Sequence, residues 1–156
     1  MGLSLKEANK PITFIKGDDF QTFVKQILFP KDKYNLVQIT PGYETNMDRF
    51  VESSKDPDFK FRSRISGDEF YVEAKYRSIF YRNTVTWCKR YQLDRYTELD
   101  KQTPVYIALG VEGQAISPRQ VFLFPVRLAP YTKLFRSFLL KFKISPSHSV
   151  DIKTLS

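Results

Sequence analysis

The chain has 156 residues, 42% of them hydrophobic and 15% aromatic, which favours one globular domain and excludes an intrinsically disordered chain. Twenty-five Lys and Arg against 17 Asp and Glu give a formal charge of +8, which suits a nucleic-acid partner, although a basic protein that binds no nucleic acid has the same composition. No apolar run approaches the roughly 18–20 residues of a membrane span, and the N-terminal residues lack the apolar core of a signal peptide. We therefore expect a cytoplasmic protein with no membrane partner.

The first predicted element is a helix that follows a polar N-terminal arm. Residues 16–19 are typical of a helix start with an acidic cap. Apolar residues then recur at helical spacing through 20–28, and Pro30 ends the run. A short strand is predicted over Tyr34–Ile39, and residues 41–56, rich in turn formers and charge, are a predicted loop.

A β-hairpin is predicted next. Polar and apolar residues alternate through 58–65 and again through 70–77, on either side of a turn that contains Gly67. Two alternating runs around a glycine-containing turn are typical of paired antiparallel strands.

The second half of the chain predicts a helix over 84–99, a strand over 103–111 and a strand over 121–126. The first of these strands is almost continuously apolar, as expected of a strand buried on both faces, and Pro125 favours an edge position for the second. A last helix over 131–142 has an apolar face surrounded by Lys and Arg. It is either an ordinary amphipathic element with a solvated basic face or part of the path of a bound DNA.

This order of elements predicts an α/β (α+β) fold, in which a mixed central sheet is flanked by helices. We expect a single domain over residues 1–156, with a core at about 17–142 between the polar arm and a polar tail.

The composition restricts the chemistry that a site can use. Cys88 is the single cysteine, which excludes an internal disulfide and a multi-cysteine zinc site. His148 is the single histidine and lies in the polar tail, where a solvated side chain is the favoured interpretation. Carboxylates, lysines and a hard cation such as Mg²⁺ remain.

Two residues of the hairpin form the centre of the predicted site. Because strand side chains alternate, Glu73 and Lys75 share one face, and Asp58 can lie beside them if a bend or bulge corrects the register. Two converging carboxylates suit Mg²⁺, and a nearby lysine can orient the attacking water. Taken alone, however, Glu-x-Lys is common on exposed strands.

The helix predicted over 84–99 adds two residues to this site. Its apolar stripe, from Val85 through Cys88 to Tyr96, is interrupted by Gln92. A buried amide without partners costs roughly 1–3 kcal/mol, so Gln92 should face a polar group such as the hairpin carboxylates. A helix rotated so that Gln92 lies at its rim is the alternative.

Pro57-Asp58, Glu73-Ala74-Lys75 and Gln92 to Tyr96 together resemble the motif series of the PD-(D/E)xK nuclease superfamily, the restriction-endonuclease-like fold, in its RecB-type Gln-x-x-x-Tyr variant. The resemblance covers roughly residues 17–126. It implies that Asp58 and Glu73 bind Mg²⁺, for which Mn²⁺ can substitute, and that Lys75 assists the attacking water. Gln92 and Tyr96 would support the site or contact the substrate.

One position departs from that pattern. Many members carry a glutamate in the first helix, where this chain has Gln21. We therefore expect a Mg²⁺-dependent nuclease that hydrolyses phosphodiester bonds in DNA, with a catalytically weak or inactive nuclease-fold module that binds nucleic acid as the alternative. A homodimer is one assembly open to such a protein.

Basic side chains near the hairpin are the candidates for binding phosphates. They are Arg62, Arg64 and Arg77, on the site face or its edge, together with Lys89 among the aromatic residues of 76–91. Those aromatics could stack on bases, although core and rim positions are the favoured interpretation for most of them.

Overall fold

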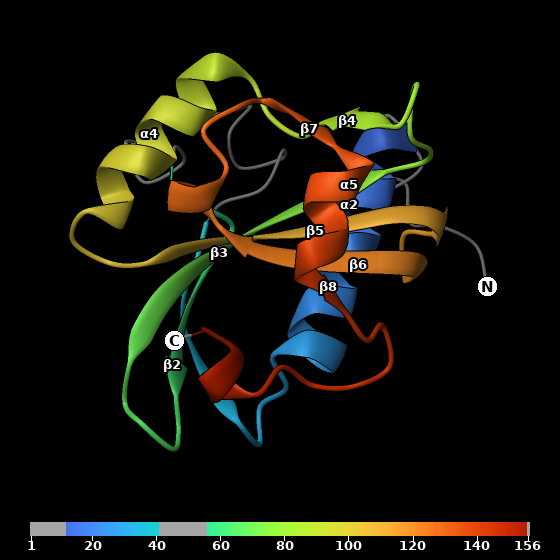
Figure 1. The fold of residues 1–156 in the computed structure, drawn as a ribbon. Helices are drawn as coiled ribbons and strands as arrows, with labels where there is room; N and C mark the ends of the chain where they lie inside the picture. The colour runs from blue at the N-terminus through green and yellow to red at the C-terminus, as the bar shows by residue number, and fades with distance from the viewer. Residues whose placement is uncertain (1–11, 41–55, 156) are drawn as a thin grey trace.

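A computed structural model describes residues 12–40 and 56–155. Its centre is a six-stranded mixed sheet with the strand order β1-β2-β3-β5-β6-β8 (Figure 1). The strands are β1 (Tyr34–Ile39), β2 (Phe59–Ser63), β3 (Glu69–Arg77), β5 (Val105–Gln114), β6 (Ser117–Pro125) and β8 (Lys143–Ile144). Only β3 and β5 pair in parallel; the other neighbours are antiparallel. The mixed sheet expected from the sequence is confirmed.

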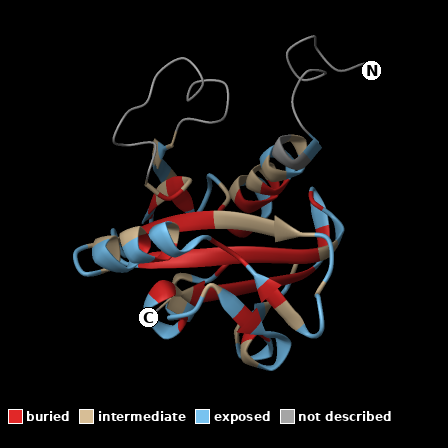
Figure 2. Cartoon of the chain, turned by 90° about the horizontal axis from the view of Figure 1, so that it is seen from above, coloured by how far each residue is buried: buried red, intermediate tan, exposed pale blue. Residues whose placement is uncertain are grey.

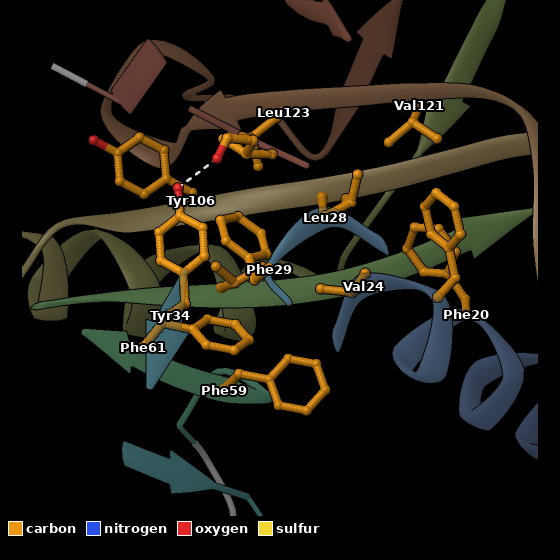
Figure 3. Close-up of a cluster of buried hydrophobic side chains, with 14 of the residues drawn as sticks. Phe20, Val24, Leu28, Phe29, Tyr34, Phe59, Phe61, Tyr106, Val121 and Leu123 are labelled. Atoms are coloured by element: carbon orange, nitrogen blue, oxygen red, sulfur yellow. Dashed lines mark hydrogen bonds between the residues drawn. The ribbon is translucent and has the colours of Figure 1, made fainter. Parts of the chain in front are cut away.

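The first helix covers one face of this sheet. It comprises α2 (Ile12–Phe23) and a π-helical turn η1 (Val24–Leu28), so it begins before residue 16 and the predicted acidic cap is wrong. Its apolar side packs on β2, β3 and β5 in a cluster rich in aromatic rings (Figure 3). Ring pairs such as Phe29 on Phe61, with centroids 4.9 Å apart, fill this layer.

The opposite face carries α4 (Arg90–Asp100), α5 (Arg136–Leu139) and a second, two-stranded sheet of β4 (Thr84–Thr86) and β7 (Lys133–Phe135). Buried residues of these elements form the second core cluster, with Trp87 fully enclosed. In Figure 2 the buried colour runs along the central strands between the two layers. Strand β5 contributes to both clusters, because Tyr106 and Ala108 face α2 while Ile107 and Leu109 face α4.

Two predicted helices differ from the structure. Residues 84–86 are the strand β4, so the helix predicted over 84–99 begins only at Arg90. The helix predicted over 131–142 contains β7, the short α5 and a 3₁₀ turn η4 (Leu140–Phe142). In both cases β4 and β7 pair with each other, a long-range contact that overrides local helical spacing.

Three smaller features complete the chain. Strand β6 is not the edge, since β8 pairs with Val121 and Phe122, but Pro125 lies beyond that pairing. Short 3₁₀ turns are found at η3 (Val126–Leu128) and η5 (Ile152–Leu155).

The predicted loop over 41–56 lies almost wholly outside the described residues. No helix in the described part of the chain is long and apolar enough to cross a membrane.

Close packing of α2 on β5 depends on Gly110. A Cβ atom at this position would lie 2.5 Å from Cε1 of the buried Phe20 ring. Gly110→Ala should therefore destabilise the fold by about 1–3 kcal/mol, the usual cost of overpacking a core. Urea unfolding followed by circular dichroism measures the change.

Gly17→Ala is the matched control, because Gly17 lies within α2 and no heavy atom would be within 4 Å of its Cβ. It should leave stability unchanged or raise it by up to about 1 kcal/mol. Equal unfolding midpoints for Gly110→Ala and the wild type would contradict this packing.

Candidate active site

Asp58, one residue before β2, lies next to Glu73 of β3. The pairing Phe59 with Val72 continues without a bulge to the strand ends, and the Asp58 backbone N–H donates to Glu73 Oε1 at 3.0 Å. Within this ladder the loop is centred between Ile65 and Ser66 rather than at Gly67. Asp58 itself lies in a bend one residue before β2, so the two carboxylates meet where the ladder ends.

Three other elements hold the Asp58 residue in place. Its Oδ2 accepts the Ala74 backbone N–H at 2.8 Å, and its Oδ1 accepts Gln21 Nε2 from α2 at 3.1 Å. Its carbonyl oxygen accepts the Thr40 N–H at 2.9 Å, at the end of β1. Gln21, expected at the position where many members of the resembled superfamily carry a glutamate, thus reaches the site, but it is an amide that adds no negative charge.

Lys75 and Tyr96 converge on Glu73. Lys75 Nζ lies 3.2 Å from Glu73 Oε2, as strand alternation predicts, and Glu73 itself is buried. Tyr96 comes from α4 on the same face of the sheet and is buried. Burial, the charges of Glu73 and Asp58, and a hydrogen bond to Glu73 all raise the pKa of Tyr96 above its ordinary value. The hydroxyl therefore stays protonated and acts as a donor to Glu73.

The negative charges of Asp58 and Glu73 are not fully compensated by nearby positive charge. Desolvation is the main effect that raises the pKa of Asp58 well above its ordinary value, and the charge of Glu73 adds to it. The Ala74 N–H and Lys75 act in the opposite direction without reversing the shift. Two neighbouring carboxylates, of which only Glu73 is in contact with a lysine, are thus an environment that a divalent cation would stabilise.

The donor set fits Mg²⁺ better than a softer metal. Among the described residues no group of three His, Cys, Asp or Glu side chains is placed to hold an ion. Mg²⁺ binds through one or two carboxylates and completes its shell with water and phosphate oxygens. Asp58 and Glu73 are the two residues that would hold it.

The site opens to solvent through a pocket of about 510 Å³. Gln21, Asp58, Glu73 and Lys75 line its floor and walls, and Lys16 and Arg77 add positive charge. Lys16 was not among the expected site residues, because the helix was predicted to start there rather than four residues earlier. Its side chain reaches Ser78 Oγ at 3.5 Å across the pocket.

Gln92 does not occupy the position expected for it. Because α4 begins at Arg90, Val85 and Cys88 are not on the same helix, and the apolar stripe that Gln92 was thought to interrupt does not exist. Its Oε1 accepts the backbone N–H of Lys89 at 3.0 Å, which caps the first turn of α4. A role for Gln92 in the site stays a prediction.

A second contact from α4, which the motifs did not indicate, supports the segment before Asp58. Arg95 Nη2 binds Asp56 Oδ1 at 2.9 Å, and Gln38 Nε2 of β1 donates to Asp56 Oδ2 at 3.3 Å. Since Arg95 and Tyr96 are adjacent, one turn of α4 fixes both Asp56 and Glu73.

The four basic residues expected to bind phosphates have different surroundings. Arg77 donates to the carbonyls of Tyr76, Thr86 and Trp87, and burial lowers the pKa of its guanidinium. Its donors therefore hold β4 against β3, although it also lines the pocket.

The other three lie farther out. Arg62 pairs with Glu69 near the hairpin turn, and Arg64 Nε donates to the Lys31 carbonyl at 2.6 Å. At about 3.4 Å per residue they lie roughly 14 and 20 Å along β2 from Asp58, too far to touch a phosphate in the pocket. Lys89 is exposed at the start of α4. Phosphate binding by these residues stays a prediction.

Comparison with known proteins identifies the fold. No protein-family model matches the sequence, and no curated protein matches it. The structure is similar to Archaeoglobus fulgidus Hjc, a Holliday junction resolvase, with a TM-score of 0.50 and 15% sequence identity over 74% of this chain and 84% of Hjc. Hjc belongs to the PD-(D/E)xK nuclease superfamily. The restriction-endonuclease-like fold expected from the motif series is therefore confirmed, while its RecB-type Gln-x-x-x-Tyr variant stays a prediction.

The raised pKa of Asp58 predicts how the stability of the fold depends on pH. A raised pKa means that the folded state binds the Asp58 proton more tightly than the unfolded state, so stability falls as pH rises from about 4 through the folded pKa. Asp58→Asn keeps an oxygen that accepts the Ala74 N–H but removes the charge. At pH 7 in EDTA the variant should melt above the wild type, by about 2–4 °C for each kcal/mol gained.

Melting curves between pH 4 and 8 measure this difference, which should shrink towards pH 4. Asp68→Asn is the control, because Asp68 is an exposed carboxylate in the hairpin turn, and it should change stability by less than about 0.5 kcal/mol. An Asp58→Asn protein that melts below the wild type at pH 7 would contradict the incomplete compensation of these charges.

Proposed function

We propose that the chain is a Mg²⁺-dependent nuclease that hydrolyses phosphodiester bonds in DNA. The observation that carries the proposal is the opposed pair Asp58 and Glu73, with Lys75 Nζ 3.2 Å from Glu73, in an open pocket. The fold shared with Hjc, described as a Holliday junction resolvase, supports DNA as the partner. The formal charge of +8 supports it independently.

Asp58 and Glu73 would hold the Mg²⁺ ion, which when bound supplies Lewis-acid polarisation of the phosphate and activation of water. The chain's own groups position the reactants. Lys75 places a positive charge where negative charge develops on the phosphate in the transition state, and it orients the attacking water. The Tyr96 hydroxyl and the Ala74 N–H restrict the orientations of Glu73 and Asp58, so that both carboxylates are preorganised.

One chain supplies every group used in this proposal, namely Asp58, Glu73, Ala74, Lys75 and Tyr96, so the proposal needs no second subunit. Homodimerisation and a cytoplasmic location stay predictions.

Loss of cleavage in two variants tests the proposal. Glu73→Gln and Lys75→Ala should each lower Mg²⁺-dependent cleavage of linear and plasmid DNA by at least about 100-fold, because each removes a charge that acts at the reacting phosphate. Gel assays with Mg²⁺, with Mn²⁺ and with EDTA measure the rates.

Glu69→Gln is the matched control, since Glu69 lies on the same strand and face but pairs with Arg62 and Lys60 away from the pocket. It should cut at the wild-type rate. Undiminished cleavage by both Glu73→Gln and Lys75→Ala would overturn the assigned site.

A catalytically weak or inactive module that binds nucleic acid is the second candidate, and the Gln21 contact with Asp58 favours it. A carboxylate at this position would strengthen the attraction for a cation. Gln21→Glu should therefore raise the cleavage rate at limiting Mg²⁺ and lower the melting temperature in EDTA, because it adds a third negative charge to the site.

The conservative variant Gln21→Asn separates charge from contact, because it shortens the side chain without adding charge. It should show neither effect. A Gln21→Glu protein with wild-type cleavage and wild-type stability would contradict a role for Gln21 at the metal position.

A further inference from the structure

The net positive charge of the chain comes from two stretches, which contact each other through the pairing of β4 with β7. Residues 74–93 and 113–150 contain no Asp or Glu, and they hold 11 of the 25 Lys and Arg. The rest of the chain therefore has 14 basic residues against all 17 acidic ones, a formal charge of −3. The two acid-free stretches contain β4 and β7, which form the two-stranded sheet. The net charge of +8 thus arises wholly from these stretches.

This second sheet has an outward face with an unusual composition. Val85 and Leu134 pair inward and are buried, so the outward pairs are Thr84 with Phe135 and Thr86 with Lys133. Phe135 is 63% exposed, although burying an aromatic ring of this size would stabilise the fold. Large exposed apolar groups in one place mark binding surfaces more often than isolated ones do.

A second exposed aromatic ring lies at the same hollow as Phe135. Tyr131 is 68% exposed, and it lines with Phe135 and Lys133 a hollow of about 650 Å³. Arg90, whose side chain is 73% exposed, lies at the same hollow. We call this surface, defined by Arg90, Tyr131, Lys133 and Phe135, the aromatic platform.

The cations at and beside the platform are Arg90, Lys133 and Arg136, and only Arg90 has an acidic partner among the described residues. In the described part of the chain no ion pair involves Lys133 or Arg136, and the only one at Arg90 is with the exposed Asp94 at 3.1 Å. The Arg136 guanidinium instead lies 5.1 Å from the centre of the Phe80 ring. These charges are free to bind an anion.

The platform is fixed relative to the candidate active site. Trp87 donates from its backbone N–H to the Thr132 carbonyl at 2.9 Å and from Nε1 to the Tyr131 carbonyl at 3.0 Å. Arg77, two residues after Lys75, binds the carbonyls of Thr86 and Trp87. A continuous series of hydrogen bonds therefore joins the site strand β3 to the platform.

We propose that the aromatic platform binds an unpaired segment of DNA, with bases stacked on Tyr131 and Phe135 and phosphates held by Lys133 and Arg90. Exposed aromatic rings and exposed cations match the two components of a single strand, its base faces and its phosphates. A duplex offers phosphates but hides the base faces, so the aromatic rings would gain nothing from it. The proposal rests on the proposed function for the choice of DNA, and it adds a preference for substrates with unpaired bases beside the duplex.

Fluorescence anisotropy of a labelled 12-nucleotide oligothymidylate tests the platform. The full chain is used in EDTA, so that binding is measured without cleavage. Phe135→Ala should weaken binding about 5- to 100-fold, the usual loss when one stacking ring is removed. Phe135→Leu should lose a similar amount, because it keeps apolar area but no ring, whereas Phe135→Tyr should bind within about twofold of the wild type.

Charge is tested with a matched pair of exposed lysines. Lys133→Gln should weaken binding and lower the salt dependence by roughly one phosphate contact. Lys31→Gln, on the β1 side of the molecule, should have a smaller effect on both. A 12-base-pair duplex should be bound by Phe135→Ala as by the wild type.

Three results would overturn the proposal. They are wild-type affinity in both Phe135→Ala and Phe135→Leu, wild-type affinity in Phe135→Leu alone, and equal losses in the two lysine variants. Self-association that Phe135→Ala abolishes while oligonucleotide binding is unchanged would assign the surface to a second copy of the chain instead. Glu73→Gln should bind the oligonucleotide like the wild type. Oligonucleotide binding that depends on Phe135, without any DNA cleavage by the wild type, would contradict only the proposed nuclease activity. DNA cleavage by a wild type whose oligonucleotide binding does not depend on Phe135 would contradict only the platform.

Discussion

Two carboxylates held next to each other by neighbouring strands are the constraint on which the rest of the site depends. The antiparallel pairing of β2 with β3 brings Asp58, one residue before β2, next to Glu73, and neither strand can slip without turning its residues to the other face. Helices α2 and α4 and strand β3 itself contribute groups that stabilise this arrangement. These groups are the Gln21 amide from α2, the Ala74 N–H and Lys75 from β3, and the Tyr96 hydroxyl from α4.

The two hydrophobic layers explain why the contributing helices reach the site. Phe20 packs against Gly110 on one side of the sheet, and Gln21 follows it towards Asp58. Tyr96 stacks beside Trp87 on the other side, with ring centroids 6.5 Å apart, while its hydroxyl reaches Glu73. The contacts that pack the core thus also position the site residues. The hydrophobic packing around the two carboxylates offsets their destabilising effect on the fold. Natural sites commonly retain such a cost where binding requires it.

The sequence was sufficient for features that depend on local periodicity. Alternation placed Glu73 and Lys75 on one face, and the apolar run through Ile107 and Leu109 predicted the doubly buried strand β5. The interpretation of Gln92 was wrong in its physical basis, because Val85 and Cys88 match helical spacing by coincidence while β4 is determined by its pairing with β7, nearly 50 residues later. The register of Asp58 also depended on the position of a loop centre that glycine alone did not locate. Charge segregation was visible in the sequence, but only the pairing of β4 with β7 showed that the two acid-free stretches form one surface.

The most direct test of the site is the binding of a divalent cation by the isolated protein. Titration of the metal-free wild type with Mn²⁺ at pH 7.5, followed by electron paramagnetic resonance of the free ion, should detect a bound ion that Mg²⁺ displaces. Glu73→Gln and Asp58→Asn should each abolish this binding, while Glu69→Gln keeps it. Equal Mn²⁺ binding by the wild type and by both site variants would contradict a metal centre at the opposed carboxylates.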